Sequence, residues 1–334
     1  MKKQILFGSA LALAAVAIFT RRRKLNLRGS VVVITGGSRG LGLALARGFA
    51  ARGAHLLLCA RNAEELNRAR RDCSGAPGRI VTLVCDVTVR EQVQNLIHHA
   101  LAEFGRIDLL VNNAGAIRVG PIHTMEIGDF EDAMNVMFWG TVYTTLAALP
   151  HFRSRGEGCV VNITSIGGKV SVPHLVPYSC AKFAAVAFSE GLRAELSGTG
   201  VKVITIAPGL MRTGSYLNAV FKGAEKGEAA WFSASASIPG ISMSARRAAR
   251  QIIAAIEQGR AERILSTQAN LLARFHGLFP ETTVAILGLV NRLLPSGSEG
   301  VETGAESAIL ERPWMRALTK LGRDAAAEYL QPVE

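Results

Sequence analysis

A tyrosine and a lysine four residues apart offer a proton donor tuned by a nearby cation. Tyr178 and Lys182 open an expected helix over residues 178–196, and side chains at i and i+4 of a helix share one face. A cation beside a phenol stabilises the phenolate and lowers its pKa from about 10. Such a tyrosine can exchange a proton with a carbonyl or alcohol oxygen. Because the pair also occurs by chance, this chemistry needs support from the rest of the chain.

A glycine-rich turn suits the phosphates of a dinucleotide. It reads TGGSRGLG over residues 35–42 and joins an expected strand, 31–34, to an expected helix, 41–52. Backbone N–H groups at such a turn reach a pyrophosphate at the positive end of the helix. A bulky side chain at Gly36, Gly40 or Gly42 would obstruct the turn or the approach of the helix to the phosphate. The residues expected to contact the cofactor here are Thr35, Gly36, Ser38, Arg39, Gly40, Leu41 and Gly42.

The end of the expected second strand, 56–59, decides which nicotinamide cofactor is preferred. Sites that prefer NAD place an acid there for the ribose 2′-hydroxyl. This chain reads Cys59-Ala60-Arg61-Asn62, without an acid. Arg61 and Arg39 could clamp a 2′-phosphate together, and the alternative is a pair of solvated surface arginines. The pattern favours NADP(H).

Short aliphatic runs alternate with helical patterns from residue 31 onward. Strands are expected at 31–34, 56–59, 80–85, 109–111, 160–163 and 201–206, and helices at 41–52, 91–104, 178–196 and 245–258. Continuous aliphatic strands are typical of sheets covered on both faces. Strands that alternate with helices predict an α/β fold with a doubly wound, Rossmann-type parallel sheet. We expect this catalytic domain to span residues 30–260, between an N-terminal segment, 1–29, and a C-terminal helical extension, 261–334.

Other polar residues stand where the expected strands end. Ser165 follows the strand 160–163 and precedes Tyr178 by thirteen residues. The remaining positions are Asp86, the sequence Asn112-Asn113-Ala114-Gly115, Asn135 in a helical stretch, Pro208-Gly209 and Thr213. With these motifs at these spacings, residues 30–260 resemble a classical short-chain dehydrogenase/reductase.

The resemblance implies a catalytic tetrad of Asn135, Ser165, Tyr178 and Lys182. Tyr178 would be the general acid for carbonyl reduction, and Lys182 would lower its pKa and hold the nicotinamide ribose. Ser165 would polarise the substrate carbonyl, and Asn135 would keep a water in a proton relay to Lys182.

The resemblance also assigns NADP(H) contacts outside the glycine turn. Asp86, with Val87, would lie at the adenine, and Asn112, Ala114 and Gly115 would support the sheet and the adenine side. Pro208 and Gly209 would pass close to the nicotinamide, and Thr213 would bond its carboxamide. Tyr178 and Lys182 complete the set.

The N-terminus carries a membrane signal. Residues 5–19 contain no charge and would span about 23 Å as a helix, which is short of a ~30 Å hydrocarbon core. The basic cluster 21–24 follows directly and favours an uncleaved membrane anchor that leaves the main domain in the cytoplasm. The alternative is a cleaved signal peptide and an exported enzyme, because residues 15–17 resemble a cleavage site.

The distribution of charge indicates which partners the protein binds, and its cysteines indicate the compartment. The first 30 residues hold seven basic side chains and no acid, so they supply +7 of the formal net charge of +12. Without a zinc-finger or RNA-binding signature, this pattern favours a membrane surface over nucleic acid. The five cysteines form no CxxC motif and are expected as buried residues in a reducing compartment. The pair His98-His99 has no further ligand in register, so no metal site is expected.

The segments after residue 209 leave alternatives open. The apolar side chains of residues 210–240 (Tyr216, Leu217, Phe221, Trp231 and Phe232) fit either a hydrophobic substrate entrance or ordinary packing. Apolar pairs across 264–294 predict two helices broken at Pro280, as a membrane-lying hairpin, a lid or a dimer interface. Residues 296–306 are expected as a linker and 314–330 as a final short helix. His174 is expected as a loop histidine or as part of the substrate mouth.

These features together predict an NADP(H)-dependent oxidoreductase acting on a lipophilic ketone or secondary alcohol. Sterol-like, long-chain 3-oxo and retinoid-like molecules are the substrate classes considered. The alternative is a protein of another functional class, a membrane-tethered NADP(H)-binding scaffold or redox sensor without significant turnover. The resemblance also implies a homodimer or homotetramer.

Overall fold

A parallel sheet of seven strands forms the centre of the computed structural model, which describes residues 25–297 and 300–331. The strand order is β11-β7-β6-β4-β1-β2-β3, and every neighbouring pair is parallel. The strands are β1 Val31–Thr35, β2 His55–Ala60, β3 Ile80–Val84, β4 Leu109–Asn112, β6 Gly158–Ile163, β7 Val201–Ala207 and β11 Glu262–Ile264. This order confirms the doubly wound, Rossmann-type prediction, with β1 and β4 on either side of the point where the strand order reverses.

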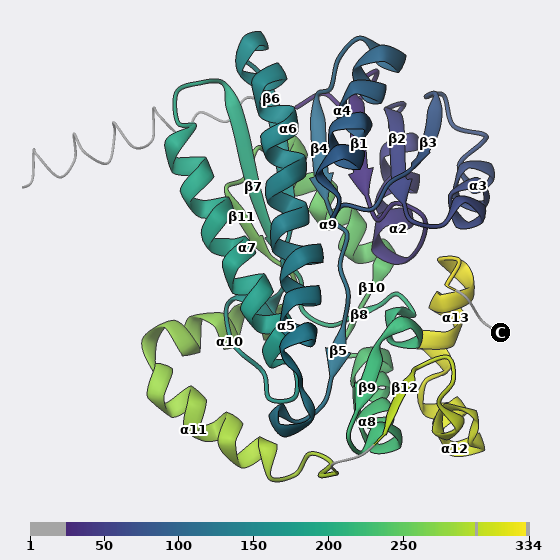
Figure 1. Ribbon diagram of the computed structural model, residues 1–334, viewed down its shortest axis with the longest axis vertical. Helices are drawn as coiled ribbons and strands as arrows, with labels where there is room; N and C mark the ends of the chain where they lie inside the picture. Colours follow the sequence, from purple (N-terminus) through teal and green to yellow (C-terminus); the bar gives the residue numbers. More distant parts are fainter. Residues whose placement is uncertain (1–24, 298–299, 332–334) are drawn as a thin grey trace, which may run out of the picture.

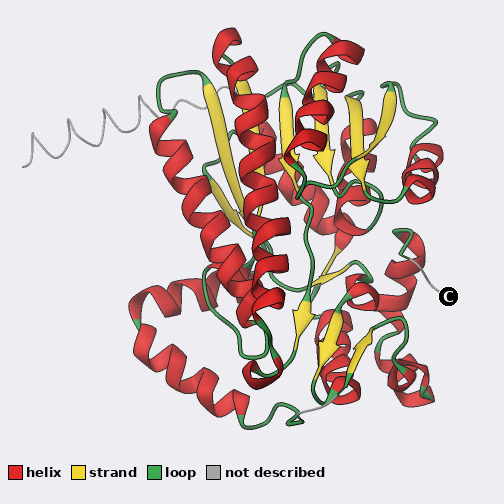
Figure 2. Ribbon diagram, in the orientation of Figure 1, coloured by secondary structure: helices red, strands yellow, loops and turns green. Residues whose placement is uncertain are grey.

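Helices cover both faces of this sheet (Figures 1 and 2). They are α2 Gly40–Ala50, α3 Ala63–Asp72, α4 Arg90–Phe104, α6 Gly140–Arg155, α7 Val176–Glu195 and α9 Ala245–Glu257. Val32 and Ile34 of β1 pack in one cluster with α2 and α9, and Val33 packs in the other with α4 and α6. Successive strand side chains point to opposite faces, so a continuous aliphatic strand fills both cores.

The sheet continues past residue 260, where we expected the catalytic domain to end. The last strand, β11, lies at 262–264 and pairs with β7, and Leu265 is buried in the main core. The first of the apolar pairs predicted as helix, at 264/265, therefore belongs to the end of a strand. The next ones do form two helices, α10 Thr267–Leu278 and α11 Pro280–Asn291, which break at Pro280 as predicted.

A small accessory layer lies below the carboxyl ends of the main strands in Figure 1. It combines a three-stranded sheet, β12-β9-β5, a two-stranded sheet, β10-β8, and three helices. Its elements are β5 Arg118–Val119, β8 Met211–Arg212, β9 Val220–Lys222, β10 Met243–Ser244, β12 Val301–Thr303, α8 Glu225–Ser237, α12 Pro313–Leu318 and α13 Lys320–Glu328. The expected linker 296–306 thus contains β12, and the expected single helix 314–330 is two helices that meet at Thr319.

The aromatic residues of segment 210–240 pack inside this accessory layer. Tyr216, Phe221 and Phe232 are buried in a cluster with Met315 of α12. They are therefore core residues, which favours ordinary packing, the second of the two alternatives, over a substrate entrance.

Four cysteines are buried as predicted, and Cys180 is exposed. No helix within residues 25–297 and 300–331 is long and apolar enough to span a membrane. The predicted N-terminal anchor at residues 5–19 falls outside the described part of the chain.

Candidate active site

Ser165 and Tyr178 meet at the carboxyl end of the sheet. Helix α7 begins at Val176, two residues before the expected start, with Pro177 in its first turn. Ser165 follows β6, and its Oγ accepts a hydrogen bond from the Gly167 amide at 3.0 Å. A Cβ on Gly167 would lie 3.1 Å from the Tyr178 ring and 3.4 Å from the Ser165 Oγ. Gly167 thus lies between the two hydroxyl-bearing side chains, and a larger residue there would crowd the Tyr178 ring.

The Tyr178 side chain is partly buried, and its hydroxyl is protonated in this state. Burial raises the pKa of Tyr178, and the adjacent Ser165 hydroxyl lowers it by a smaller amount through a hydrogen bond. A phenol of this kind is a proton donor held ready for an oxygen that becomes basic during a reaction.

Lys182 carries its ammonium group into the same interior. Its side chain is 5% exposed, its Nζ donates to the Ile163 carbonyl at 2.9 Å, and it lies 5.8 Å from the centre of the Tyr178 ring. Burial lowers the pKa of Lys182 from 10.5 to about 8. The structure thus brings Ser165, Tyr178 and Lys182 together as the sequence predicted.

Asn135 does not join them, which corrects the predicted tetrad. It is exposed and opens a π-helical turn, Asn135–Trp139, between α5 Ile127–Met134 and α6. Met137, two residues on and so on the other side of the helix, is buried against Ala181 and Tyr178. A π turn holds one residue more than an α turn and often marks a functional site. The Met137 thioether thus lies beside Tyr178, where we expected the side-chain amide of the tetrad.

The backbone around Ser165 is held by the following strand. The Thr164 amide donates to the Ile206 carbonyl at 2.7 Å, and the Ile166 amide donates to the Pro208 carbonyl at 2.7 Å. Pro208 therefore lies beside Ser165, and its predicted contact with the nicotinamide stays a prediction. Gly209 packs against the start of α10, since a Cβ there would lie 3.3 Å from the Ala269 Cβ.

The glycine turn is closed by contacts that only glycine permits. Gly36 has φ +62°, and a Cβ on it would lie 3.0 Å from the Ala114 Cα. A Cβ on Gly42 would lie 2.0 Å from the Gly36 carbonyl oxygen. The Thr35 Oγ1 accepts hydrogen bonds from the amides of Asn113 and Ala114 at 3.0 and 3.1 Å. The turn and the segment after β4 therefore form one rigid unit beneath the first amides of α2, which lack intrahelical acceptors.

The side chain of Asn112 is not available to a cofactor. Its Nδ2 donates to Asn162 Oδ1 and Thr145 Oγ1, and its Oδ1 accepts from Thr144. Asn112 thus ties β4 to β6 and α6, and the predicted cofactor contact by its side chain is wrong. A Cβ added to Gly115 would lie 3.8 Å from the side chain of Met137.

An acid that sequence inspection missed stands beside the predicted 2′-phosphate clamp. Glu65 of α3 accepts from Ser38 Oγ at 2.9 Å and pairs with Arg39 at 3.1 Å. Burial lowers the pKa of Arg39, Glu65 raises it, and the nearby Arg61 and Arg68 lower it further. Neither Arg61 nor Arg68 forms an ion pair with another described residue. Three guanidinium groups thus lie near one another, and only that of Arg39 is paired with a carboxylate in the described part of the chain, which leaves an excess of positive charge.

Asp86 and Val87 follow β3 at the same edge of the sheet. The Asp86 carboxylate accepts from the amide and the hydroxyl of Thr88 at 2.9 and 2.8 Å, and Val87 is buried. The Asp86 carboxylate therefore stabilises the turn after β3, and its predicted contact with adenine stays a prediction.

The C-terminal segment reaches the glycine turn, which the sequence did not reveal. The Gly40 amide donates to the Tyr329 carbonyl at 2.9 Å. Gln331 donates from Nε2 to the Thr213 carbonyl at 3.0 Å and accepts at Oε1 from Asn218 at 2.7 Å. We call residues 329–331 the C-terminal strap. The strap covers Gly40 and Thr213, both predicted cofactor contacts.

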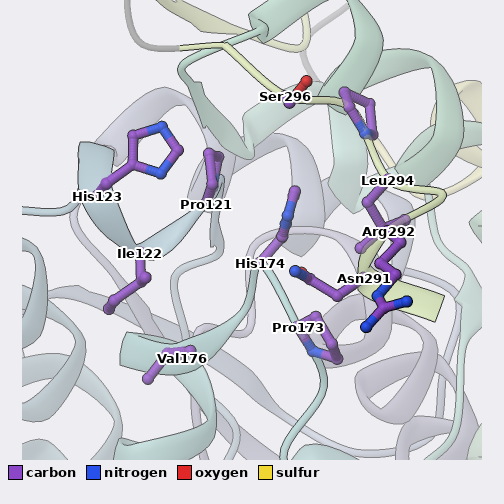
Figure 3. Close-up of a pocket in the computed structure, with 11 residues that line it drawn as sticks. Pro121, Ile122, His123, Pro173, His174, Val176, Asn291, Arg292, Leu294 and Ser296 are labelled. Carbon is purple, nitrogen blue, oxygen red and sulfur yellow. The ribbon is translucent and has the colours of Figure 1, made fainter. Parts of the chain in front are cut away.

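A pocket of about 420 Å³ opens in front of α7 (Figure 3). Its walls come from residues 121–123, from the segment 173–176 before Tyr178, and from residues 291–296 after α11. His174 lines it, with φ +63° and its Nδ1 2.7 Å from the Glu228 Oε1. Glu228 is fully buried, and it also accepts from Trp231 Nε1 at 2.6 Å. His174 therefore fits the substrate-mouth interpretation and is held in place by α8.

The site fits a nicotinamide dinucleotide on two observations. A lysine ammonium has three N–H donors, but Lys182 gives a hydrogen bond only to Ile163 among the described residues, so ribose hydroxyls would supply the acceptors it lacks. The first turn of α2 offers the backbone amides of Leu41 and Gly42 to a pyrophosphate, whereas the Gly40 amide is bonded to the Tyr329 carbonyl. Residues 35–42, Lys182 and Thr213 are therefore the ones that would hold the cofactor.

Comparison with known proteins identifies the family. The short chain dehydrogenase family matches residues 30–220. A solved short-chain dehydrogenase from Streptomyces avermitilis superposes with a TM-score of 0.68 and 30% identity, over 79% of this chain and 97% of that one. The chain belongs to the short-chain dehydrogenase/reductase family, whose members bind a nicotinamide cofactor.

Two curated relatives are similar over a shorter range. The chain is 37% identical over 221 residues to mouse (Mus musculus) dehydrogenase/reductase SDR family member 7B, covering 65% of this chain and 68% of the relative. It is 32% identical over 206 residues to estradiol 17-beta-dehydrogenase 11 of Macaca fascicularis, covering 61% and 69%. The matched segments thus span about two thirds of the length of these relatives.

Proposed function

We propose that this protein is an NADP(H)-dependent oxidoreductase that interconverts a ketone and a secondary alcohol on a lipophilic molecule. The observation that carries the proposal is the group of Ser165, Tyr178 and Lys182 beside the loop of Pro208. One relative is named an estradiol dehydrogenase, which supports a lipophilic substrate.

The chain's own residues divide the proton chemistry between them. The bound cofactor supplies the hydride. Ser165 donates a hydrogen bond to the substrate oxygen and stabilises the negative charge that develops there. Tyr178 gives that oxygen its proton, and Lys182, with a pKa of about 8, stabilises the phenolate that remains.

The preference for NADP(H) rests on charge at the predicted 2′-phosphate position. Arg39, Arg61 and Arg68 together oppose the single carboxylate of Glu65. A phosphate dianion is favoured by this excess, whereas a ribose hydroxyl gains little from it. We expect Arg61→Ala to raise the KM for NADPH and to leave the KM for NADH nearly unchanged.

The lipophilic substrate is supported by the pocket in front of α7. Pro121, Ile122, Val176 and Leu294 give it an apolar wall, and the polar groups of the lining come from His123, His174, Asn291, Arg292 and Ser296. This composition suits a largely apolar molecule with one polar end.

The test is a panel of ketones assayed through NADPH absorbance, with and without detergent, and repeated with NADH. Tyr178→Phe should lower kcat by about 10²- to 10⁴-fold, the usual contribution of a general acid. Equal turnover of small polar ketones, with none of sterol or long-chain ketones, would contradict the substrate class.

A scaffold or redox sensor without turnover is the second candidate. The replacement of the expected amide by Met137 beside Tyr178 favours it. Binding of NADPH with no measurable turnover, together with an unchanged cellular phenotype for Tyr178→Phe, would support this alternative.

A further inference from the structure

The two helices α10 and α11 form a hairpin that stands out from the body of the molecule (Figure 1). Ala269 is the only buried residue of α10, and Thr283 is the only one of α11. The hairpin is joined to the core at its base, where Ala269 packs near Gly209. The described part of the chain thus leaves most of its surface uncovered.

The outer face of α10 is apolar. Leu271, Phe275 and Leu278 lie at i, i+4 and i+7 and are all exposed, Leu278 at 74%. Residues at this spacing form one stripe along a helix. Exposed apolar stripes on a soluble surface mark contact with another apolar body.

Helix α11 is apolar on all sides. Residues 284–290 read VAILGLV. Ile286, Leu289 and Val290 are exposed on one side, and Val284 is exposed on nearly the opposite side. A helix that is apolar all round is typical of one immersed in an apolar medium. A second protein surface would cover one side of α11 and leave the other in water.

We propose that the α10–α11 hairpin is a docking surface for a phospholipid bilayer. A fluid hydrocarbon layer surrounds an inserted helix on all sides. It can therefore contact the apolar side chains of α11 that point in opposite directions. The charged residues of segment 267–294 are Arg274, Glu281 and Arg292. Both arginines lack an ion-pair partner among the described residues, and long basic side chains reach from an apolar layer to anionic headgroups.

The hairpin also ends at the pocket in front of α7. Asn291, Arg292 and Leu294 line that pocket together with His174. A docked hairpin therefore brings the mouth of the pocket to the membrane surface, where apolar molecules are concentrated. This last step rests on the proposed function, whereas docking itself does not.

The experiment places a fluorescent probe on the hairpin of the full chain. Ile286→Cys and Leu318→Cys are made in a Cys180→Ser background, in which the four remaining cysteines are buried. The two positions are matched in exposure, 47% and 42%, and Leu318 lies on α12, on the opposite side of Figure 1. Each variant is labelled with an environment-sensitive dye and reconstituted into phosphatidylcholine–phosphatidylserine vesicles.

Nitroxide-labelled lipids report contact with the hydrocarbon layer. We expect strong quenching of the dye at position 286 and little at 318, whatever else in the chain binds the vesicles. A Leu289→Gln/Leu293→Gln pair should reduce the quenching at 286 several-fold. Equal quenching at both positions, or none at 286, would overturn the proposal.

Two further readouts separate the other outcomes. Disulfide-linked dimers through Cys at 286, without quenching, would show that a second copy covers the hairpin and would also overturn the proposal. Quenching does not require turnover, so an inactive enzyme that still shows quenching at 286 would contradict the proposed function and leave the docking surface intact.

Discussion

Burial of the Lys182 ammonium group lowers the stability of the folded protein. Lys182 is almost fully buried and has no carboxylate partner among the described residues. Its pKa falls from 10.5 to about 8 because of desolvation. The unfolded chain therefore binds the proton more tightly than the native one, and native stability rises as the pH rises from about 8 to 10.5.

We predict that Lys182→Met stabilises the cofactor-free protein at pH 7. A shift of this size corresponds to at most about 3 kcal/mol, and the lost hydrogen bond to Ile163 reduces the gain. The advantage should shrink between pH 8 and 10.5, where wild-type Lys182 loses its proton. Urea unfolding at pH 7 and pH 10 measures both effects. A Lys182→Met protein less stable than wild type at pH 7 would show that burial of the charge is not costly.

Met137 is the residue that sets this site apart from the pattern we expected. We predict that Met137→Asn raises kcat several-fold, because an amide beside Tyr178 can hold a relay water. The same change should lower the free energy of unfolding by about 1–3 kcal/mol, since a polar group enters an apolar cluster. Met137→Leu is the control and should leave kcat unchanged. Steady-state kinetics in which the two variants give equal kcat would exclude the relay.

The error at Asn135 has a physical cause that sequence inspection could not detect. The resemblance assigned the amide role to the asparagine at 135, and motif matching does not show which side chains of a helix face the site. In the structure Asn135 is exposed and Met137, two residues on within the π turn Asn135–Trp139, is the residue buried against Tyr178. Ser165, Tyr178 and Lys182 were predictable because a strand end and a regular helix turn fix their positions.

At the scale of elements, the C-terminal strap connects the end of the chain to the cofactor turn. We predict that Gln331→Ala raises the KM for the dinucleotide about fivefold, since it removes a hydrogen bond worth about 1 kcal/mol that orders Thr213. The kcat should change little, because Gln331 is remote from Tyr178.

Arg316→Ala is the matched control for the strap. Arg316 pairs with Glu311, and both side chains are exposed, so this ion pair contributes little. Initial rates at varied cofactor concentration distinguish the two variants. An unchanged KM in Gln331→Ala would show that the strap only closes the fold.

The strap could not be predicted, whereas the helices that precede it largely could. Periodicity reveals where residues 264–294 form helices, but it carries no information on what they pack against. Contacts such as Gly40 with Tyr329 join opposite ends of the sequence. The acid Glu65 was missed for a related reason, because it reaches Arg39 from a helix rather than from the end of β2.

At the scale of the whole molecule, the π turn and the α6 helix that follows it present a second apolar surface. Trp139, Tyr143 and Leu146 follow one helical face, with the first two rings stacked at 5.8 Å, and Leu146 is 53% exposed. We predict a homodimer formed through this face. Leu146→Glu should shift light-scattering mass toward the monomer, and Leu321→Glu on α13 should not.

The overall architecture was the most predictable level of this protein. Aliphatic strands alternating with helices permit few arrangements other than a doubly wound sheet, and buried runs such as Val31–Thr35 are unambiguous. The accessory layer was not predicted, since β5, β9 and β12 are too short for a periodic signal.

The contact between Gly40 and Tyr329 has a consequence for biosynthesis. A nascent polypeptide emerges amino end first and folds as it lengthens, so the phosphate-binding turn is made long before its covering residues leave the ribosome. The Gly40 amide therefore gains its carbonyl acceptor only after residue 329 has been made, and chains stalled before that residue would keep the turn uncovered.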